Sequence, residues 1–363
     1  MRFVGPIASI DTAALGHNLE VARRHAPRSR IWAVIKADAY GHGMEQAAAA
    51  LTAADGFAVA RLEEALRLRA GGVEHPILVL NGALSAEETA VAWEARLDLA
   101  VHQAEQADWL AALPLTAAVA HRPLRIWLKV DTGMHRLGLE PAEVAHIQAR
   151  LADCPVVVPG PGLLTHLANA DEPADPLSNL QCQRLRALAR PGQALNIGNS
   201  AGILACPAAR ADWVRPGIML YGGSPFGDRD AAALGLRPVM TLKAQISATH
   251  VYRAGERIGY GGTFVCPEDM PVGVAAIGYG DGYPRHAPTG TPVLVKGRRV
   301  PLIGRVSMDS ITLDLRPCPE ARPGDEVILW GPGLPVEEIA QAAGTISYDL
   351  LCGVSPRVRR EYR

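Results

Sequence analysis

Short apolar runs alternate with helical segments along the first part of this chain, and this alternation constrains the fold more than any other feature. From about Ile31 to Gly222 the runs are separated by segments with Ala, Glu, Arg and Leu at helical spacing, such as RLEEALRLRA, which Gly71 and Gly72 are expected to end. The runs are IWAVIKA, GFAVA, PILVLNG, LDLAVH, RIWLKVDTG, GLLTHLA, ALNIGNS and VRPGIMLYG. Alternation of this kind makes the strands parallel. Eight such units over roughly two hundred residues predict a (β/α)8 TIM barrel.

The residue pattern of the sequence changes after about Arg237. Helical periods give way to β-rich runs separated by Gly and Pro turns, namely TLKAQISATHVY, VGVAAIGYG, TPVLVKG, SITLDL and EVILWG. This pattern predicts a mainly antiparallel β domain, with VEEIAQAAG as a short helix. The basic tail PRVRREYR is interpreted as a solvated tail or an ion-paired strand at an interface. We therefore expect a barrel domain over residues 11–237 and a β domain over 238–363 together with 1–10.

Composition excludes several classes of partner. The chain has 363 residues and a net charge of −1, which gives no electrostatic reason to expect a nucleic acid or an anionic membrane as a partner. No signal peptide and no apolar run of membrane-spanning length is recognised. The six cysteines are scattered and form no C-x-x-C pair, which argues against a metal site and a disulfide framework. A cytoplasmic protein acting on small molecules is expected.

Lysine is scarce in this chain. Of 36 basic residues only Lys36, Lys129, Lys243 and Lys296 are lysine, so arginine serves wherever a general positive charge is sufficient. A lysine that persists is therefore a candidate for chemistry that arginine cannot perform, such as forming a Schiff base or carrying a carbamate.

Reactive side chains recur where the barrel strands are expected to end. Lys36 ends the first strand, Arg136 follows the fifth, His166 ends the sixth, Ser200 ends the seventh, and the segment 215–217 lies in the eighth-strand motif. The carboxyl ends of barrel strands meet on one face, where barrel enzymes carry their active sites. These residues therefore predict a shared pocket.

Lys36 stands at the end of an apolar strand. Partial desolvation there lowers the pKa of a lysine and frees an amine for imine formation, although a lysine that merely reaches from a strand end to water has the same pattern. Gly41 and Gly43 bracket His42 and predict a permissive turn that can approach a ligand closely. This local sequence favours the reactive interpretation.

The other candidates each have a plain structural alternative. Alternation in RIWLKVDTG directs Lys129 into the barrel, where an ion pair with Asp131 or a neighbour is the ordinary solution. His166 is also compatible with a satisfied core histidine. Ser200, Gly217 and Ile218 offer a hydroxyl and backbone N–H groups to a phosphate, or serve ordinary turns. Tyr260 lies between glycines, which suggests an exposed and sterically unusual position.

At these residues the chain resembles the alanine racemase family. The resemblance is carried by AVIKADAYGHG, DTGMHRLG, THLANADE, NSAG, VRPGIMLYG, IGYGGTF, GYGDGYPR, GRVSMD and TISYDL, in that order along the chain. Two positions depart from the frequent family pattern: Asp38, where Asn is frequent, and Phe264, where Tyr is frequent. The resemblance implies a TIM barrel followed by a β domain, pyridoxal 5′-phosphate (PLP) as cofactor, and interconversion of L- and D-alanine.

The resemblance also implies residue roles. Lys36 would hold PLP through an imine and act as one base, and Tyr260, from the other subunit of a homodimer, would act as the opposite base. Arg215 would donate to the pyridine nitrogen, and His166 would link Arg215 to the catalytic tyrosine. Phosphate would be held by Tyr40, Ser200, Gly217, Ile218 and Tyr348. Arg136 and the partner's backbone N–H at Met308 would meet the substrate carboxylate, with a carbamate on Lys129 orienting Arg136. The entrance would be formed by Tyr279, Tyr348, Asp171, Arg285 and Arg305.

Two bases on opposite faces are the direct solution for removing a proton from one side of a carbon and returning one to the other. Two alternatives remain open. A PLP-dependent amino-acid decarboxylase of the same fold type shares the lysine motif, but usually pairs the pyridine nitrogen with a carboxylate rather than with an arginine such as Arg215. A non-catalytic PLP-binding homeostasis protein shares the barrel but lacks residues comparable to 238–363. The sequence leaves open whether D-alanine is made for peptidoglycan or degraded.

Overall fold

The computed structural model describes residues 5–113 and 123–363. Contacts between Cα atoms divide the chain into two compact units. One unit comprises residues 16–39 and 44–220, and the other comprises residues 1–15, 40–43 and 221–363. Each unit is described by itself.

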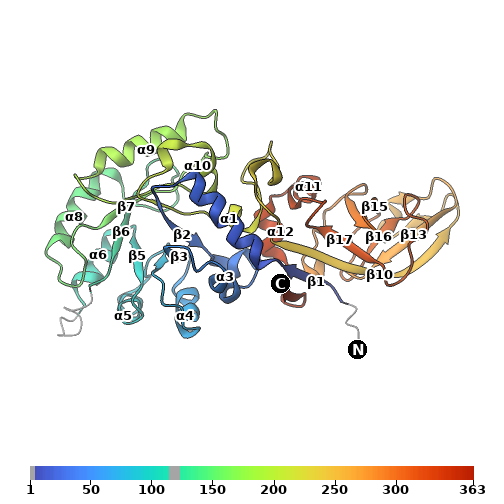
Figure 1. Cartoon of the computed structure of the whole chain (residues 1–363), viewed down its shortest axis with the longest axis horizontal. Coiled ribbons are helices and arrows are strands. Elements are labelled where there is room, and N and C mark those ends of the chain that lie inside the picture. The colour runs from blue at the N-terminus through green and yellow to red at the C-terminus, as the bar shows by residue number, and fades with distance from the viewer. Residues whose placement is uncertain (1–4, 114–122) are drawn as a thin grey trace. The chain divides into compact units, whose positions relative to one another are not determined.

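Eight parallel strands close into a barrel in the unit that ends at Leu220 (Figure 1). The strands are β2 (Arg30–Val34), β3 (Gly56–Val59), β4 (Ile77–Val79), β5 (Asp98–Val101), β6 (Ile126–Lys129), β7 (Gly162–Leu164), β8 (Leu195–Asn196) and β9 (Trp213–Val214). The barrel closes where β2 pairs with β9, with Arg30 opposite Trp213. Seven of the eight runs expected to form a barrel strand contain most or all of one of these strands, and the eighth, VRPGIMLYG, begins at the second residue of β9. The predicted TIM barrel is therefore confirmed.

Helices connect the barrel strands. They are α1 (Thr12–His25), α2 (Lys36–Gly41), α3 (Met44–Ala50), α4 (Leu62–Ala70), α5 (Ala86–Glu94), α6 (Ala104–Ala111), α8 (Val144–Ala152), α9 (Leu177–Leu188) and α10 (Ser200–Ala205), with 3-10 turns η1 (Pro141–Glu143), η2 (Pro207–Ala209) and η3 (Ile218–Tyr221). Local sequence explains their ends. The Ser85 hydroxyl caps α5 by accepting from the Glu88 amide, and α4 ends before Gly71, as expected.

Three tryptophans pack together at the barrel strands. The rings of Trp32 and Trp213 stack with centroids 4.5 Å apart, and Trp127 meets Trp213 edge-on at 6.1 Å. Gly56 and Gly162 make room for them, because a Cβ atom at either position would lie within 2.5 Å of an indole ring. Side chains two residues apart on a strand share a face, so Lys129 lies on the face of Trp127, nearer the carboxyl end of β6.

The second unit is built on an eight-stranded sheet, mostly antiparallel, in the order β13-β16-β15-β14-β17-β10-β1-β18. These strands are β1 (Ile7–Ile10), β10 (Met240–Tyr252), β13 (Met270–Ala275), β14 (Pro292–Val295), β15 (Arg298–Ile303), β16 (Ile311–Asp314), β17 (Glu326–Trp330) and β18 (Arg359–Tyr362). The unit also contains η4 (Ala232–Leu234), η6 (Tyr279–Asp281), α11 (Val336–Ala342) and α12 (Ser347–Gly353). The predicted β domain and its helix in VEEIAQAAG are therefore confirmed.

The two ends of the chain meet in this sheet. Strand β1 pairs antiparallel with β10 and parallel with β18, so that Ile10 lies opposite Tyr362. The Thr12 amide donates to the carbonyl of Arg363 at 3.0 Å. The basic tail, expected as a solvated tail or an interface strand, is an edge strand of the sheet.

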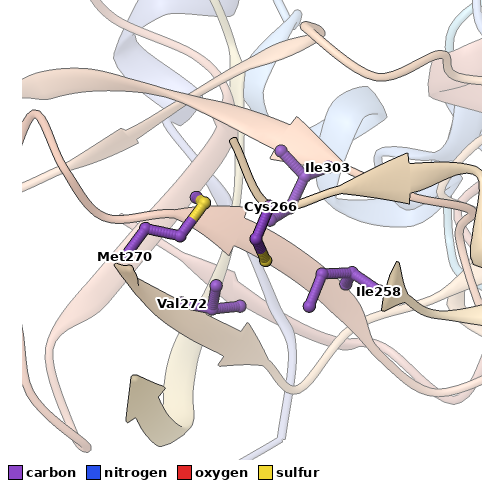
Figure 2. Close-up of a cluster of buried hydrophobic side chains, with 5 residues drawn as sticks. All are labelled: Ile258, Cys266, Met270, Val272 and Ile303. Atoms are coloured by element: carbon purple, nitrogen blue, oxygen red, sulfur yellow. The ribbon is translucent and has the colours of Figure 1, made fainter. Parts of the chain in front are cut away.

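A small hydrophobic core supports a two-stranded hairpin. Strands β11 (Arg257–Ile258) and β12 (Phe264–Val265) pair antiparallel on either side of the turn η5 (Tyr260–Gly262). Figure 2 shows the buried side chains Ile258, Cys266, Met270, Val272 and Ile303 gathered into one cluster. Tyr252 and Phe264 pack against this cluster from its rim. Among the described residues, no helix is long and apolar enough to span a bilayer.

Candidate active site

Lys36 directly precedes an unusual left-handed turn. In α2, Ala37, Asp38, Ala39 and Tyr40 have φ between +52° and +55°, and Gly41 follows at +81°. The left-handed conformation costs an L-residue roughly 1–2 kcal/mol, so a run of four non-glycine residues persists only where the surroundings hold it. The sequence predicted a permissive turn from its glycines, but it did not predict that four residues with side chains would adopt the strained conformation.

Five basic side chains act electrostatically on one another at the carboxyl ends of the barrel strands. They are Lys36 after β2, Lys129 and Arg136 at and after β6, His166 after β7, and Arg215 after β9. Burial, followed by the neighbouring cations Arg215, Arg136 and Lys36, lowers the pKa of Lys129 to about 8. Burial and the same cations hold the pKa of His166 well below its usual range. The structure thus brings these five barrel residues into one cluster whose charge suits an anion.

Asp131 does not neutralise Lys129. Its Oδ1 accepts hydrogen bonds from the amides of Gly133, Met134 and His135 at 2.9–3.1 Å, and its Oδ2 lies 3.3 Å from the His135 ring. In the part of the chain that the structure describes, the 7% exposed Lys129 has no carboxylate partner. The ion pair considered as the ordinary explanation is therefore absent from these residues.

Arg215 is fixed by four acceptors. One terminal nitrogen donates to the backbone carbonyl of Asn196 at 3.0 Å and to its side-chain oxygen, and the other donates to the carbonyls of Thr165 at 2.6 Å and Ile197 at 3.1 Å. Burial lowers the pKa of Arg215 to about 9, which leaves it protonated at neutral pH. Within the described residues the Nε–H has no acceptor, so this fifth donor remains for a ligand.

Ser200 and the segment after β9 form a small polar cradle. The buried Ser200 hydroxyl oxygen accepts from the amides of Gly217 at 2.9 Å and Met219 at 3.3 Å. Because the turn η3 begins at Ile218, its first amides lack acceptors inside the turn. The Gly217 and Met219 amides are therefore paired with Ser200, and the Ser200 hydroxyl hydrogen and the Ile218 amide are the donors here that an anion could use.

The remaining candidates belong to the second unit. Tyr40 is buried and stacks on Tyr221 with centroids 4.7 Å apart, and Tyr348 of α12 lies tilted at 6.0 Å from Tyr40. His42 also stacks on Tyr221, with ring centroids 4.7 Å apart. Burial, followed by the nearby Tyr348, raises the pKa of Tyr40, so its phenol stays a neutral donor.

Tyr260 lies at the tip of the hairpin supported by the hydrophobic cluster. Its side chain is 68% exposed. Gly259 and Gly261 on either side have φ of +70° and +72°, which the sequence anticipated as a sterically unusual position. A Cβ atom at Gly261 would lie 3.4 Å from the guanidinium of Arg305, so Arg305 borders the same turn.

Tyr279 and Met308 are held together by their backbones. The Tyr279 amide donates to the Ser307 carbonyl at 3.0 Å, and the Gly280 amide donates to the Met308 carbonyl at 2.9 Å. Their side chains are exposed, 39% for Tyr279 and 53% for Met308. Arg285 in this unit and Asp171 in the barrel unit are also exposed.

Sequence reasoning missed two supporting residues. Asn196 orients Arg215, and Glu64 contacts the turn after Lys36. Asn196 is the first residue of NIGNS, at the end of an expected strand, which is a weak signal, and nothing in the sequence points to Glu64. Within the described ranges, no group of three or more His, Cys, Asp or Glu side chains could hold a metal ion.

A closed parallel barrel with lysine, arginine and histidine at the carboxyl ends of its strands places this chain in the TIM-barrel class, with basic side chains at the face where barrel enzymes carry their active sites. Family comparisons identify the member of that class. Residues 10–225 match the N-terminal domain of alanine racemase, and residues 239–362 match its C-terminal domain. The chain belongs to the alanine racemase family.

Individual relatives match this chain over almost its whole length. It is 55% identical to an alanine racemase of Nitrosococcus oceani and 53% identical to one of Thioalkalivibrio sulfidiphilus, with 98% of each chain covered in both cases. The crystal structure of the biosynthetic alanine racemase of Pseudomonas aeruginosa superposes with a TM-score of 0.93 at 46% identity, covering 99% of this chain and 100% of that one. That of Bartonella henselae, with covalently bound pyridoxal phosphate, gives 0.89 at 28% identity, with 99% and 100% covered.

Proposed function

We propose that this protein binds PLP and racemises alanine. The observation that carries the proposal is the set of basic side chains at the mouth of the barrel, in a chain of the alanine racemase family. The charged groups that lower the pKa of His166 are all cations, so this cluster favours an anionic ligand. The phosphate and phenolic oxygen of PLP and the carboxylate of alanine are all anions.

The residues present fit PLP. The polar cradle of Ser200, Gly217 and Ile218 suits a phosphate, and Tyr40 and Tyr348 of the other unit would add phenolic donors. The unused Nε–H of Arg215 suits a pyridine nitrogen, because arginine donates a hydrogen bond without giving up its proton. The primary amine of Lys36 suits covalent attachment to an aldehyde.

Lys36 and Tyr260 would divide the proton transfer between two faces of the substrate. PLP, when bound, supplies the electron withdrawal that makes the α-proton of alanine acidic. The Lys36 Nζ would take or return that proton on one face, and the Tyr260 Oη would do so on the other. His166, held neutral by its surroundings, would connect Arg215 with Tyr260. Arg136 and the backbone N–H of Met308 would bind the substrate carboxylate.

Lys129 would carry a carbamate. A lysine with a pKa of about 8 is partly neutral near physiological pH, and a neutral amine adds to CO2 with loss of one proton. The product is an anion placed among cations, where an ammonium is repelled. It would pair with Arg136 and replace the missing carboxylate partner.

We propose that two chains share each active site. Tyr260, Tyr279 and Met308 all expose large apolar surfaces, although they are expected to act on substrate. In a head-to-tail homodimer, the β domain of residues 238–363 with 1–10 would bring these residues to the partner's barrel, formed by residues 11–237. Tyr279, Tyr348, Asp171, Arg285 and Arg305 would form the entrance. A cytoplasmic location is part of the proposal.

The function is tested by incubating the purified protein, supplied with PLP, with L-alanine and separating the products by chiral chromatography. D-alanine should accumulate until both isomers are equal. Release of CO2 would indicate a decarboxylase, and PLP binding without any turnover would indicate a binding protein. Borohydride should fix the cofactor to Lys36, and an adduct on another lysine would contradict that assignment.

A further inference from the structure

Glu64 connects a helix to the residue that follows Lys36. Its Oε2 accepts from the amides of Ala60 at 2.8 Å and Arg61 at 3.1 Å, as an acidic residue at the third position of a helix does for its own N-terminus. Its Oε1 accepts from the amide of Ala37 at 2.7 Å, outside that helix. One carboxylate therefore holds both the start of α4 and the first residue of the left-handed turn.

A second side chain of α4 contacts the same turn. Arg67, one helical turn after Glu64, lies 3.6 Å from Asp38 and 2.7 Å from Glu45. Asp38 in turn accepts a hydrogen bond from the Met44 amide at 3.1 Å, at the start of α3. The first two left-handed residues are thus both tied to α4, each through a charged group.

We propose that Glu64 is a positioning residue that sets the direction of the Lys36 side chain by holding Ala37 in the left-handed conformation; the inference rests on the proposed role of Lys36. The peptide between Lys36 and Ala37 carries the N–H that Glu64 accepts, and its orientation follows the backbone angles at both residues. If Ala37 returned to the right-handed region, this N–H would lose its acceptor. The Lys36 side chain would then point in a different direction.

The carboxylate cannot be replaced by an amide at this position. Glutamate offers two acceptor oxygens, one for each end of the bridge, whereas glutamine offers one acceptor and one donor. In Glu64→Gln, the amide can cap α4 only by presenting its NH2 group to the N–H of Ala37. The variant therefore keeps the cap and loses the bond to the turn.

Glu88 supplies a matched control. It occupies the third position of the next helix, α5, where its Oε2 accepts from the Leu84 amide at 2.7 Å beside that helix. Glu64→Gln and Glu88→Gln make the same chemical change at the same helical position. If Glu64 served only to cap its helix, the two variants would lose similar thermal stability and would bind the cofactor equally well.

The first measurement is the dissociation constant of PLP for the two variants. Glu64→Gln should raise it about tenfold, equivalent to ~1.4 kcal/mol, whereas Glu88→Gln should leave it within about twofold of native. The ratio of absorbance bands of the bound cofactor should also change only in Glu64→Gln, because it reports the setting of Lys36. Equal effects of the two variants would overturn the proposal.

A glycine at the strained residue provides the second measurement. Glycine adopts positive φ without penalty, so in Ala37→Gly the left-handed conformation no longer depends on the hydrogen bond that Glu64 accepts. In that background, Glu64→Gln should change PLP affinity by no more than about twofold. An undiminished loss would show that Glu64 acts on something other than the turn.

The third measurement uses the cofactor-free protein and separates this inference from the proposed function. The amide of Ala37 should exchange with solvent faster in Glu64→Gln than in the native protein, and a crystal structure should show its φ below zero. A retained left-handed turn would refute the inference even if the native protein racemises alanine. Failure of the native protein to bind PLP would instead refute the proposed function. If Glu64→Gln does not fold, the shorter Glu64→Asp tests the same bridge.

Discussion

Arg215 and Asn196 are joined twice, because one guanidinium nitrogen donates both to the backbone carbonyl and to the side-chain oxygen of the asparagine. We expect Asn196→Ala to leave a buried guanidinium N–H without an acceptor, at a cost of about 1–3 kcal/mol in the free energy of unfolding. Racemase activity should fall more than tenfold, about the effect of one misplaced catalytic donor. Urea denaturation and steady-state kinetics measure the two effects. Gln183→Ala, on the exposed face of α9, should change neither, and an unchanged Asn196→Ala would contradict the prediction.

Lys129 should make stability depend on pH in a definite direction. Its pKa is about 8 in the folded protein and 10.5 in an ordinary environment, so between these values the unfolded chain binds more protons. The free energy of unfolding therefore rises with pH between about 8 and 10.5. Below pH 8, burying the charged Lys129 lowers the free energy of unfolding by a constant amount, on the order of 3 kcal/mol. Lys129→Met should consequently be more stable than native at pH 7 in CO2-free buffer, with the difference shrinking as pH rises through this window.

Bicarbonate distinguishes the carbamate from a bare amine at Lys129. Carboxylation would convert a repelled cation into a paired anion, so added bicarbonate should raise the melting temperature of the native protein. Lys129→Met, which has no amine to react, should not respond. Scanning calorimetry with and without bicarbonate checks this, and an equal response of both proteins would contradict the carbamate.

Gly56 should tolerate no side chain. A Cβ atom there would lie 2.3 Å from the Trp32 ring, and the ring is itself stacked on Trp213. Gly56→Ala should lower the free energy of unfolding by about 1–3 kcal/mol through overpacking. The control is Gly16→Ala in α1, where no atom lies within 4 Å of the added methyl group and alanine should stabilise the helix by about 0.5–1 kcal/mol. Opposite signs in thermal denaturation are the expected outcome, and equal signs would contradict it.

The cluster beneath the Tyr260 hairpin should matter for activity as well as stability. Ile258→Ala removes a buried side chain next to the turn that carries Tyr260, and it should cost about 2–4 kcal/mol of stability. The turnover number should fall several-fold because the tip loses its support, while PLP affinity stays native. Ile311→Ala, a buried isoleucine of β16, should cost similar stability without the kinetic loss. Matching kinetics in the two variants would show that the cluster serves stability alone.

Shared active sites can be tested by mixing two inactive variants. Lys36→Ala and Tyr260→Phe should each be nearly inactive. A heterodimer would have one site with both lesions and one site with neither, so activity should return to about half the native value per heterodimer if the sites are independent. Verified subunit exchange without recovery would place both bases on one chain.

The sequence predicted the barrel because its strands carry two independent signals. Apolar runs mark all eight strands, and lysine, arginine, histidine and serine follow them at the positions where parallel strands converge. Alternation along RIWLKVDTG also predicted that Lys129 points inward, since its neighbour Trp127 packs against Trp213. Its low exposure agrees, and the alternative of an ion pair with Asp131 is not found because backbone amides and His135 occupy that carboxylate.

The rest could not be predicted because it depends on contacts between distant segments. The left-handed run after Lys36 contains alanines that prefer the opposite hand, and groups from other segments, including α4 and the start of α3, hold it. Strand β15 was missed because its arginines and proline mask the period of two, and β18 was left open between a tail and a strand because its four residues are rich in charge. Both become strands through pairing with neighbours supplied by other parts of the chain.

The pairing of β1 with β18 also has a consequence for the order of folding during synthesis. Strand β1 is translated before all the barrel strands, yet its parallel neighbour, Arg359–Tyr362, is translated after all of them. One edge of β1 must therefore stay unpaired until Arg359–Tyr362 has emerged, and an unpaired edge is a template for association with other chains. The barrel unit, by contrast, is complete in the nascent chain before that moment. Emergence of β18, rather than collapse of the barrel, would then set the time at which this edge is protected from aggregation.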